Sequence, residues 1–301
     1  MIKSVTVTNY LGESIKLELG FPEKSGFLIQ SIDGLGPSKA DINITEIATN
    51  DGSIYNSART TTRNIVFTLG FLFNPTIEDM RQLSYKYFPL KKRVLLLFET
   101  DNRTCEIYGY VESNEPDIFS SQETTKISVI CPDPYFYSVV PGIAVFYAID
   151  PIFEFEFSNE SLSENLIEFS NIISNTEQTI LYNGDADVGI VIVINAFGPA
   201  DNISIYNTGT NESMHIDTSK LAALTGSGIM TGDEIRISTV KGNKYITLLR
   251  TGVYTNILNC LDKDSDWLQL AKGDNIFAYT AETGDTNLGF RIEYQLVYEG
   301  V

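Results

Sequence analysis

The stretch CPDPYFYS, residues 131–138, closes the first half of the chain and determines how the fold is divided. It places two prolines and three aromatic residues directly after a series of alternating strands. Prolines remove backbone donors and restrict how a chain can bend, and the aromatic rings can wedge against the cores on either side. The stretch therefore predicts a stiff joint between two domains, residues 1–140 and residues 141–301. An ordinary loop with chance aromatic residues is the alternative.

The composition is that of a packed globular protein, with 43% hydrophobic and 11% aromatic residues among 301. This length suffices for two domains, each with its own core. No run of 18 or more apolar residues occurs, so we expect no membrane insertion, and the start MIKSVTVTNY is typical of a strand and not of an export signal. The three cysteines, Cys105, Cys131 and Cys260, are odd in number and lie far apart without a CxxC pair. This excludes a fully paired disulfide scaffold and the common zinc-knuckle spacings, and it predicts buried thiols.

The negative charge is concentrated in the second half of the chain. The formal net charge is −18; residues 1–140 hold 13 Lys+Arg and 17 Asp+Glu, whereas residues 141–301 hold 8 and 22. A surface of this kind repels phosphate, so it disfavours electrostatically driven binding of nucleic acids. Solubility is the plainest explanation for the acidity.

Apolar residues recur with a period of two along most of the chain. NIVFTLGFLF, residues 64–73, places Ile65, Phe67 and Leu69 on one face, and SVTVTN, residues 4–9, alternates in the same way. This alternation predicts half-buried antiparallel strands. Asp-Gly and Asn-rich turns separate the strands, as expected where the backbone reverses.

One segment departs from this period and predicts a single helix. In NPTIEDMRQLSYKYFPLKKR, residues 74–93, Thr76 is the candidate N-cap and Pro89 ends the run. Acidic residues fill the first turn, where the helix dipole favours them. We interpret the basic residues 91–93 as a solvated helix C-terminus, not as a phosphate site. The apolar stretch VLLLFE, residues 94–99, should then form a central strand buried on both faces.

The second half predicts an all-β sandwich or jelly roll, because short strands alternate with Gly, Asn and Asp turns from residue 181 onward. Residues 141–180 look like a connecting ribbon, in which Phe153, Phe155 and Phe157 alternate with glutamates. The predicted fold class is therefore mainly β. An α+β N-terminal domain, sandwich-like or tube-like with one helix, precedes the jelly roll.

No constellation of residues for catalysis, metal binding or cofactor binding emerges. His215 is the single histidine, so no His/Cys zinc cluster can form. Residues 262–267, DKDSDW, resemble the start of a calcium loop, but Trp267 and Gly273 occupy the positions of its glycine and bidentate acid. The glycines of residues 226–234 precede a strand and lack the spacing of a phosphate cradle. We expect no enzyme, no metal and no cofactor.

The order of the motifs resembles the siphophage distal tail protein family. SIDGLGPSKADI (31–42), DGSIYNSARTTTRNIVFTLGF (51–71), TIEDMRQLSYKYFPLKKR (76–93) and ICPDPYFYS (130–138) follow one another as in its N-terminal domain. The second half, from YNGDADVGIVIVINAFG (182–198) to FRIEYQLVYEGV (290–301), resembles the galectin-like jelly roll that follows in that family. The resemblance covers nearly the whole chain, although no single motif would suffice.

The resemblance implies a structural baseplate hub, namely a homohexameric ring at the distal end of a tail tube. Its belt domains would surround the channel through which DNA passes, and its outer domains could carry receptor-binding proteins. The tail-associated lysin or spike would dock below. The location implied is the virion tail tip, assembled in the host cytoplasm. Contractile tails and phage-tail-like bacteriocins (tailocins) contain related proteins. A carbohydrate-binding adhesin module is the alternative, with Tyr182, Tyr206, Tyr245 and Trp267 as its available aromatic residues.

The stretch TNDGSIYNSARTTTRN, residues 49–64, is long and polar between two strands. In the fold of the distal tail family, such an extended arm commonly reaches a neighbouring subunit. The resemblance therefore implies that Tyr55, Arg59 and Arg63 make subunit or tube contacts. Arginine suits such interfaces because its planar guanidinium binds carboxylates in pairs. A free surface loop is the alternative.

Overall fold

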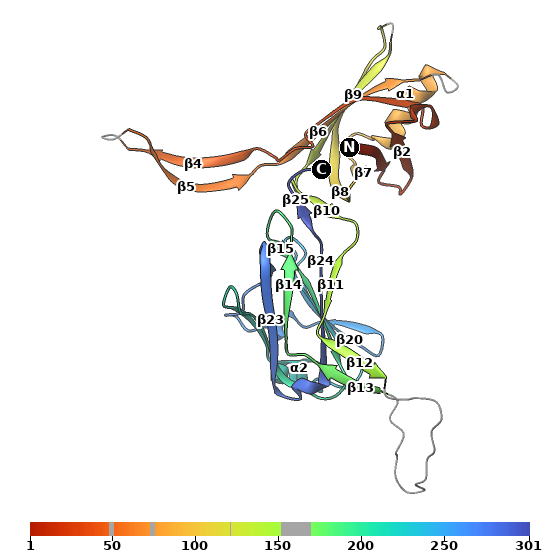
Figure 1. Ribbon diagram of the computed structural model, residues 1–301. Helices are drawn as coiled ribbons and strands as arrows, with labels where there is room; N and C mark the ends of the chain where they lie inside the picture. Colours follow the sequence, from red (N-terminus) through yellow and green to blue (C-terminus); the bar gives the residue numbers. More distant parts are fainter. Residues whose placement is uncertain (48–50, 73–75, 121, 152–169) are drawn as a thin grey trace, which may run out of the picture. The chain divides into compact units, whose positions relative to one another are not determined.

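The computed structural model describes residues 1–47, 51–72, 76–120, 122–151 and 170–301 (Figure 1). These residues form two units: unit 1 comprises Met1–Val139 and Val297–Val301, and unit 2 comprises Val140–Leu296. The division after residue 139 lies one residue before the boundary expected from the sequence. The last five residues differ from the expectation, because they return to unit 1.

The described residues of unit 1 form strands, one α-helix and one short 3-10 helix. Its elements are β1 (Ile2–Thr8), β2 (Ser14–Glu18), η1 (Pro22–Lys24), β3 (Phe27–Asp33), β4 (Ala40–Glu46), β5 (Ser53–Thr60), β6 (Arg63–Phe71), α1 (Ile77–Tyr87), β7 (Arg93–Thr100), β8 (Thr104–Asp117), β9 (Thr124–Cys131), β10 (Phe136–Ser138) and β25 (Val297–Tyr298).

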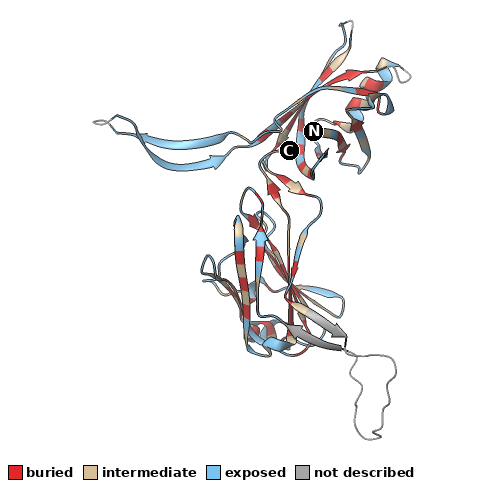
Figure 2. Ribbon diagram, viewed as in Figure 1, coloured by how far each residue is buried: buried red, intermediate tan, exposed pale blue. Residues whose placement is uncertain are grey.

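One antiparallel sheet in the order β2-β1-β7-β8-β9-β6-β3 carries unit 1, and β10 pairs with both β8 and β25. In the described part of unit 1 this sheet stands beside the separate strand pair β4-β5 and one α-helix, which agrees with the mainly β fold predicted from the sequence. The alternation in β6 is confirmed: Ile65, Phe67 and Leu69 are fully buried, while Asn64 is exposed. Figure 2 shows the buried residues along the strands and on α1.

Strand β7 corrects one expectation about this sheet. It is central, between β1 and β8, as predicted. Leu96 is fully buried, but Leu95 and Leu97 on the opposite face are only half-buried. The chain thus covers one face of β7, although the run VLLLF is typical of a strand covered on both faces.

The predicted helix is confirmed as α1. Thr76 caps it, because the Thr76 hydroxyl accepts a hydrogen bond from the Asp79 amide at 3.1 Å. Met80 is buried in the core of unit 1, and the ring of Phe88, just after the helix, lies 5.7 Å from that of Phe67 on β6. The helix therefore covers the buried face of the sheet. No helix in the described part of the chain is both long and apolar enough to cross a membrane.

A buried arginine joins four separate segments of unit 1. Arg63, the first residue of β6, is only 3% exposed. Its guanidinium donates hydrogen bonds to the backbone carbonyl oxygens of Pro134 and Glu299, both at 2.6 Å, and to those of Gly34 and Gly36. Burial lowers the pKa of this guanidinium, so the four carbonyls are needed to compensate the loss of water around the charge.

The residues around Arg63 restrict both its side chain and the neighbouring backbone. The guanidinium lies 4.5 Å from the centre of the Phe136 ring, in a cation–π contact. Gly34 has a φ of +86°, and a Cβ there would lie 2.1 Å from the carbonyl oxygen of Asn64. Only glycine fits that position. The amide of Val301 also donates to the Leu35 carbonyl at 3.1 Å, so the chain end is tied to the same loop.

Unit 2 contains two larger sheets. Its elements are β11 (Gly142–Val145), β12 (Tyr147–Pro151), β13 (Ser170–Ser174), β14 (Glu177–Tyr182), β15 (Val188–Gly189), β16 (Val191–Ala196), β17 (Asp201–Asn207), β18 (Glu212–Ile216), α2 (Thr218–Thr225), β19 (Glu234–Ser238), β20 (Tyr245–Arg250), β21 (Val253–Asn256), η2 (Leu258–Cys260), β22 (Gln269–Leu270), β23 (Gly273–Thr283), η3 (Asp285–Asn287) and β24 (Leu288–Tyr294). The sheet orders are β11-β24-β16-β19-β20-β21 and β14-β23-β17-β18.

The two sheets of unit 2 pack face to face, as a sandwich requires. Tyr279 on β23 stacks on Phe290 on β24, with ring centroids 3.8 Å apart. This agrees with the predicted mainly β fold. One difference is α2, which Asp217 caps by accepting hydrogen bonds from the amides of Ser219 and Lys220. The helix is short, and only strands were expected in this half from the sequence.

The connecting ribbon expected over residues 141–180 is also corrected. Strand β11 belongs to the six-stranded sheet and β14 to the four-stranded sheet, so both are parts of unit 2 and not a link to it. Strands β12 and β13 pair with each other. Residues 152–169, including the alternating Phe153, Phe155 and Phe157, lie outside the described residues.

The Arg63 contacts predict a large effect of Arg63→Met. Removing the guanidinium leaves four carbonyls without their donor, so the free energy of opening of unit 1 should fall by about 3 kcal/mol. Hydrogen exchange of the β6 and β9 amides measures this value for unit 1 alone. Arg59→Met is the matched control, because the Arg59 side chain is 80% exposed and its loss should change stability by less than about 0.5 kcal/mol. Equal effects of the two substitutions would contradict the assignment.

The cysteines should be unreactive in the folded protein. All three are buried, as expected, and burial raises the pKa of Cys105 to about 11 and that of Cys131 to about 12. Since the thiolate is the reactive form, labelling by Ellman's reagent at pH 8 should be at least about a hundredfold slower than in the unfolded chain. Stopped-flow absorbance with and without guanidinium chloride measures both rates. Fast labelling of a native thiol would show that the burial is incomplete.

Candidate functional site

Strands β4 and β5 form a hairpin, here called the arm, that no other strand of the described sheets joins. Every residue of both strands is exposed, and Figures 1 and 2 show the arm reaching away from the sheet of unit 1. An isolated two-stranded hairpin is at best marginally stable in water. The arm is therefore the element of unit 1 that a contact with another molecule would stabilise most.

The two faces of the arm differ in character. Ile44 lies opposite Tyr55, and Ile42 lies opposite Ala58. Directly paired residues share a face of an antiparallel pair, so these apolar side chains gather on one side. The other face carries mainly polar side chains, including Asn43 opposite Ser57 and Asp41 opposite Arg59; Ile54, opposite Thr45, is its exposed apolar residue.

A β-bulge maintains this separation. The register shifts between Asn43 and Ile44, so that Asn56 is an extra residue on β5. The Asn56 side-chain amide donates to the Thr45 hydroxyl at 2.6 Å. A bulge strengthens the local twist of a strand pair, and this one keeps Tyr55 on the same face as the isoleucines.

The root of the arm is fixed to unit 1 by hydrogen bonds. The Thr61 amide donates to the Lys39 carbonyl at 3.0 Å, and the Thr60 hydroxyl lies 3.3 Å from the hydroxyl of Tyr135. Immediately beyond the root is Arg63, with its contacts to Gly34 and Gly36. Thus the two chain segments that enter the arm are both held before the arm begins.

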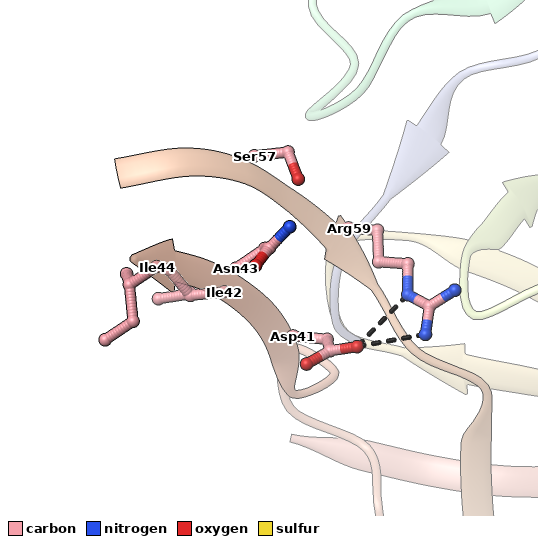
Figure 3. A pocket seen from close by; sticks show the side chains of 6 residues that line it. All are labelled: Asp41, Ile42, Asn43, Ile44, Ser57 and Arg59. Atoms are coloured by element: carbon pink, nitrogen blue, oxygen red, sulfur yellow. Dashed lines mark hydrogen bonds and ion pairs between the residues drawn. The ribbon is translucent and has the colours of Figure 1, made fainter. Parts of the chain in front are cut away.

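An ion pair lies near the root, where Nη2 and Nε of Arg59 donate to one carboxylate oxygen of Asp41 at 3.0 and 3.1 Å (Figure 3). Both side chains are exposed, so the pair contributes little to stability by itself. An open hollow of about 480 Å³ runs beside it, and all its lining residues belong to the arm. Pockets for small molecules are enclosed by several elements. This hollow is therefore better suited to a protein surface than to a small ligand.

The structure separates the three residues that the resemblance placed in subunit or tube contacts. Tyr55 is 63% exposed on the apolar face of the arm, and Arg59 is exposed beside Asp41. Arg63 is corrected: its guanidinium is buried and bonded within its own chain, so it supports the arm from inside. Ile42 and Ile44 were missed, although the alternation in ADINITE was a visible signal.

Side chains that could carry chemistry are engaged in structural contacts. His215 has the Ser204 hydroxyl 2.8 Å from Nδ1 and the Ser213 hydroxyl 3.3 Å from Nε2. Ser204 is simply its partner across β17 and β18. Within the described residues, no group of three or more His, Cys, Asp or Glu side chains could hold a metal ion.

The aromatic residues considered for sugar binding do not share a surface. Tyr182 is fully buried, whereas Tyr206 lies in the four-stranded sheet against His215. Tyr245 is on β20 of the other sheet, and the amine of Lys244 covers the ring of Trp267 at 4.8 Å. A sugar platform needs neighbouring exposed rings, and these four residues do not supply one.

Comparison with known proteins identifies the fold. The crystal structure of the SPP1 Dit (gp 19.1) protein, described as a paradigm of the hub adsorption apparatus in phages infecting Gram-positive bacteria, matches with a TM-score of 0.66. The identity is 13%, over 97% of this chain and 99% of that chain. No family model and no curated protein matches the sequence.

Two structures of the phage P2 baseplate in its activated conformation are also similar. The one with Ca has a TM-score of 0.49 at 9% identity, over 98% of both chains. The one with Sr has a TM-score of 0.47 at 10% identity, over 96% of this chain and 97% of that chain. Both scores are too low to bear on the argument. The SPP1 match confirms, at the level of the fold, the resemblance to distal tail proteins that the sequence indicated.

Proposed function

We propose that this protein is a structural distal tail protein, the baseplate hub at the end of a phage or phage-tail-like tube. The observation that carries the proposal is the coverage of the SPP1 Dit match, which spans 97% of this chain and 99% of that one. A single known fold thus accounts for both units in their order along the chain. A match to one unit alone would have left the other free for an unrelated role.

The arm supports assembly into a ring of six copies. It is exposed throughout, it carries an apolar face, and no described strand outside the hairpin pairs with it. Contacts between identical subunits would cover that face. In this ring the tail tube lies on one side and the tail-associated lysin or spike on the other, and receptor-binding proteins attach to unit 2. DNA crosses the lumen only in passage, which suits a chain of net charge −18.

Immunogold electron microscopy of particles from an induced lysate of the source strain tests the location. Antibody against this chain should label the tail end distal to the head, whereas pre-immune serum should leave it bare. Gold at the tip would support the hub and justify imaging the tip for its symmetry. Intact particles without label, with the chain found at the cell surface, would support the carbohydrate-binding adhesin instead.

The substitution Tyr55→Ala tests the contact role of the arm. Aromatic side chains at interfaces commonly contribute more than 1 kcal/mol, so incorporation into particles should fall about tenfold. Complementation of a particle that lacks this gene, scored by labelled tips, gives the measurement. The melting temperature should stay unchanged, because Tyr55 is exposed.

Tyr254→Ala serves as the matched control. Tyr254 is also a strand tyrosine, it is 67% exposed, and it lies in unit 2. This variant should assemble like the wild type. Normal incorporation of the Tyr55 variant, or an equal loss in both variants, would contradict a contact through the arm.

A further inference from the structure

A basic and apolar surface of unit 1 is formed by the turn between β1 and β2 and by the loop between α1 and β7. We call it the patch, and it consists of Tyr10, Leu11, Leu90, Lys91 and Lys92. The three apolar side chains are each more than half exposed, and both lysines are exposed. Exposed apolar groups beside unpaired charges are common at interaction sites.

Contacts between two chain segments hold the patch together. The Lys92 amine lies 5.3 Å from the centre of the Tyr10 ring, which joins the β1–β2 turn to the loop after α1. The Asn9 side chain also donates to the Lys86 carbonyl at 3.1 Å. The patch is therefore a built surface and not a chance group of flexible side chains.

The charge of the patch is not neutralised within unit 1. The nearby Lys86 pairs with Glu13 at 2.8 Å. Within the described part of the chain, no carboxylate forms an ion pair with Lys91 or Lys92. In a chain of net charge −18, two lysines without a carboxylate partner among the described residues, beside three apolar side chains, favour a partner that is both acidic and apolar.

The arm has that complementary chemistry. Alternation along β4 places Glu46 on the same face as Ile42 and Ile44, and Tyr55 joins them from β5. Asp51 follows in the exposed segment before β5. Between residues 42 and 58 the sequence has these two acids and no lysine or arginine. The outer part of the arm thus combines one apolar face with two negative charges, which are opposite in sign to the charges of the patch.

We propose that the patch receives the arm of a second copy of this chain. The inference rests on the proposed function, to which it adds the acceptor surface. The arm leaves the sheet beside β3 and β6, whereas the patch lies at β1 and β2, at the other end of the strand order. Figure 1 shows the arm pointing away from α1 and β2, so the arm does not reach the patch of its own chain.

Donor and acceptor at different edges of one sheet give a head-to-tail contact. Such heterologous contacts generate closed rings when the rotation between subunits closes, and filaments when it does not. Each copy then gives one arm and accepts one arm. In a closed ring the apolar face of every arm is covered. No exposed hairpin then remains that could pair with other chains and aggregate.

Photo-crosslinking identifies the acceptor directly. Tyr55 is replaced by p-benzoylphenylalanine in the full chain, and unlabelled chains are mixed with ¹⁵N-labelled chains before irradiation. Mass spectrometry then separates crosslinks between copies from those within one copy. We expect crosslinks between copies at the peptides that contain Tyr10 and Leu11 or Leu90 to Lys92.

Charge reversal tests whether the lysines matter. Lys91→Glu with Lys92→Glu should lower the crosslink yield at least about fivefold, because two attractions become repulsions. Adding Glu46→Lys and Asp51→Lys to the same chain should restore the yield to within about twofold. The control, Lys241→Glu with Lys263→Glu, makes the same change in net charge at exposed positions of unit 2 and should leave the yield unchanged.

The outcomes separate this inference from the proposed function. Crosslinks between copies at another surface would overturn the patch while supporting an arm contact. Failure of the charge swap to restore the yield would likewise overturn the pairing of the patch with the arm. No crosslink between copies, in solution or in particles that contain the chain, would count against both. Crosslinks to a different protein within particles would replace the second copy by that partner.

Discussion

The buried guanidinium of Arg63 is the interaction on which unit 1 depends. A charge removed from water must be compensated by hydrogen bonds, and this one is compensated by carbonyls from three separate loops. Gly34 and Gly36 lead into the arm, Pro134 belongs to the joint, and Glu299 belongs to the returning chain end. One side chain therefore determines where the arm, the joint and the chain end meet.

The hydrogen bonds at the root of the arm fix its orientation. Because β4 and β5 bury nothing within unit 1, their orientation depends on the residues just before and after them. The Asn56 bulge and the root hydrogen bonds present Ile42, Ile44 and Tyr55 in one direction. A contact made by such an arm loses less conformational entropy than one made by a free loop. Leu95 and Leu97 on β7, both half-buried, are a further place where this unit leaves apolar surface partly exposed.

The sequence predicted most of the fold and less of the site, for physical reasons. Alternation in β6 and the Thr76 cap of α1 are local signals, so both elements were predicted correctly. The pairing of β25 with β10 was not, because two residues of strand carry no signal of a partner so far away in the chain. Arg63 was predicted to make a subunit contact, but it is buried. Its burial depends on carbonyls from distant loops, and the residue type alone cannot reveal them. Ile42 and Ile44 alternate visibly, but their exposure is a property of the folded chain.

The return of the chain end imposes an order on biosynthesis. Glu299 follows Arg63 by 236 residues, and all of unit 2 lies between the two segments of unit 1. At ordinary translation rates, a nascent chain needs on the order of ten seconds to make that intervening stretch. During this time the Arg63 guanidinium lacks the Glu299 carbonyl as an acceptor. The hydrogen bonds at the root of the arm are complete only after the ribosome has finished unit 2. A polypeptide whose synthesis stops before residue 299 therefore never forms the complete set of Arg63 hydrogen bonds.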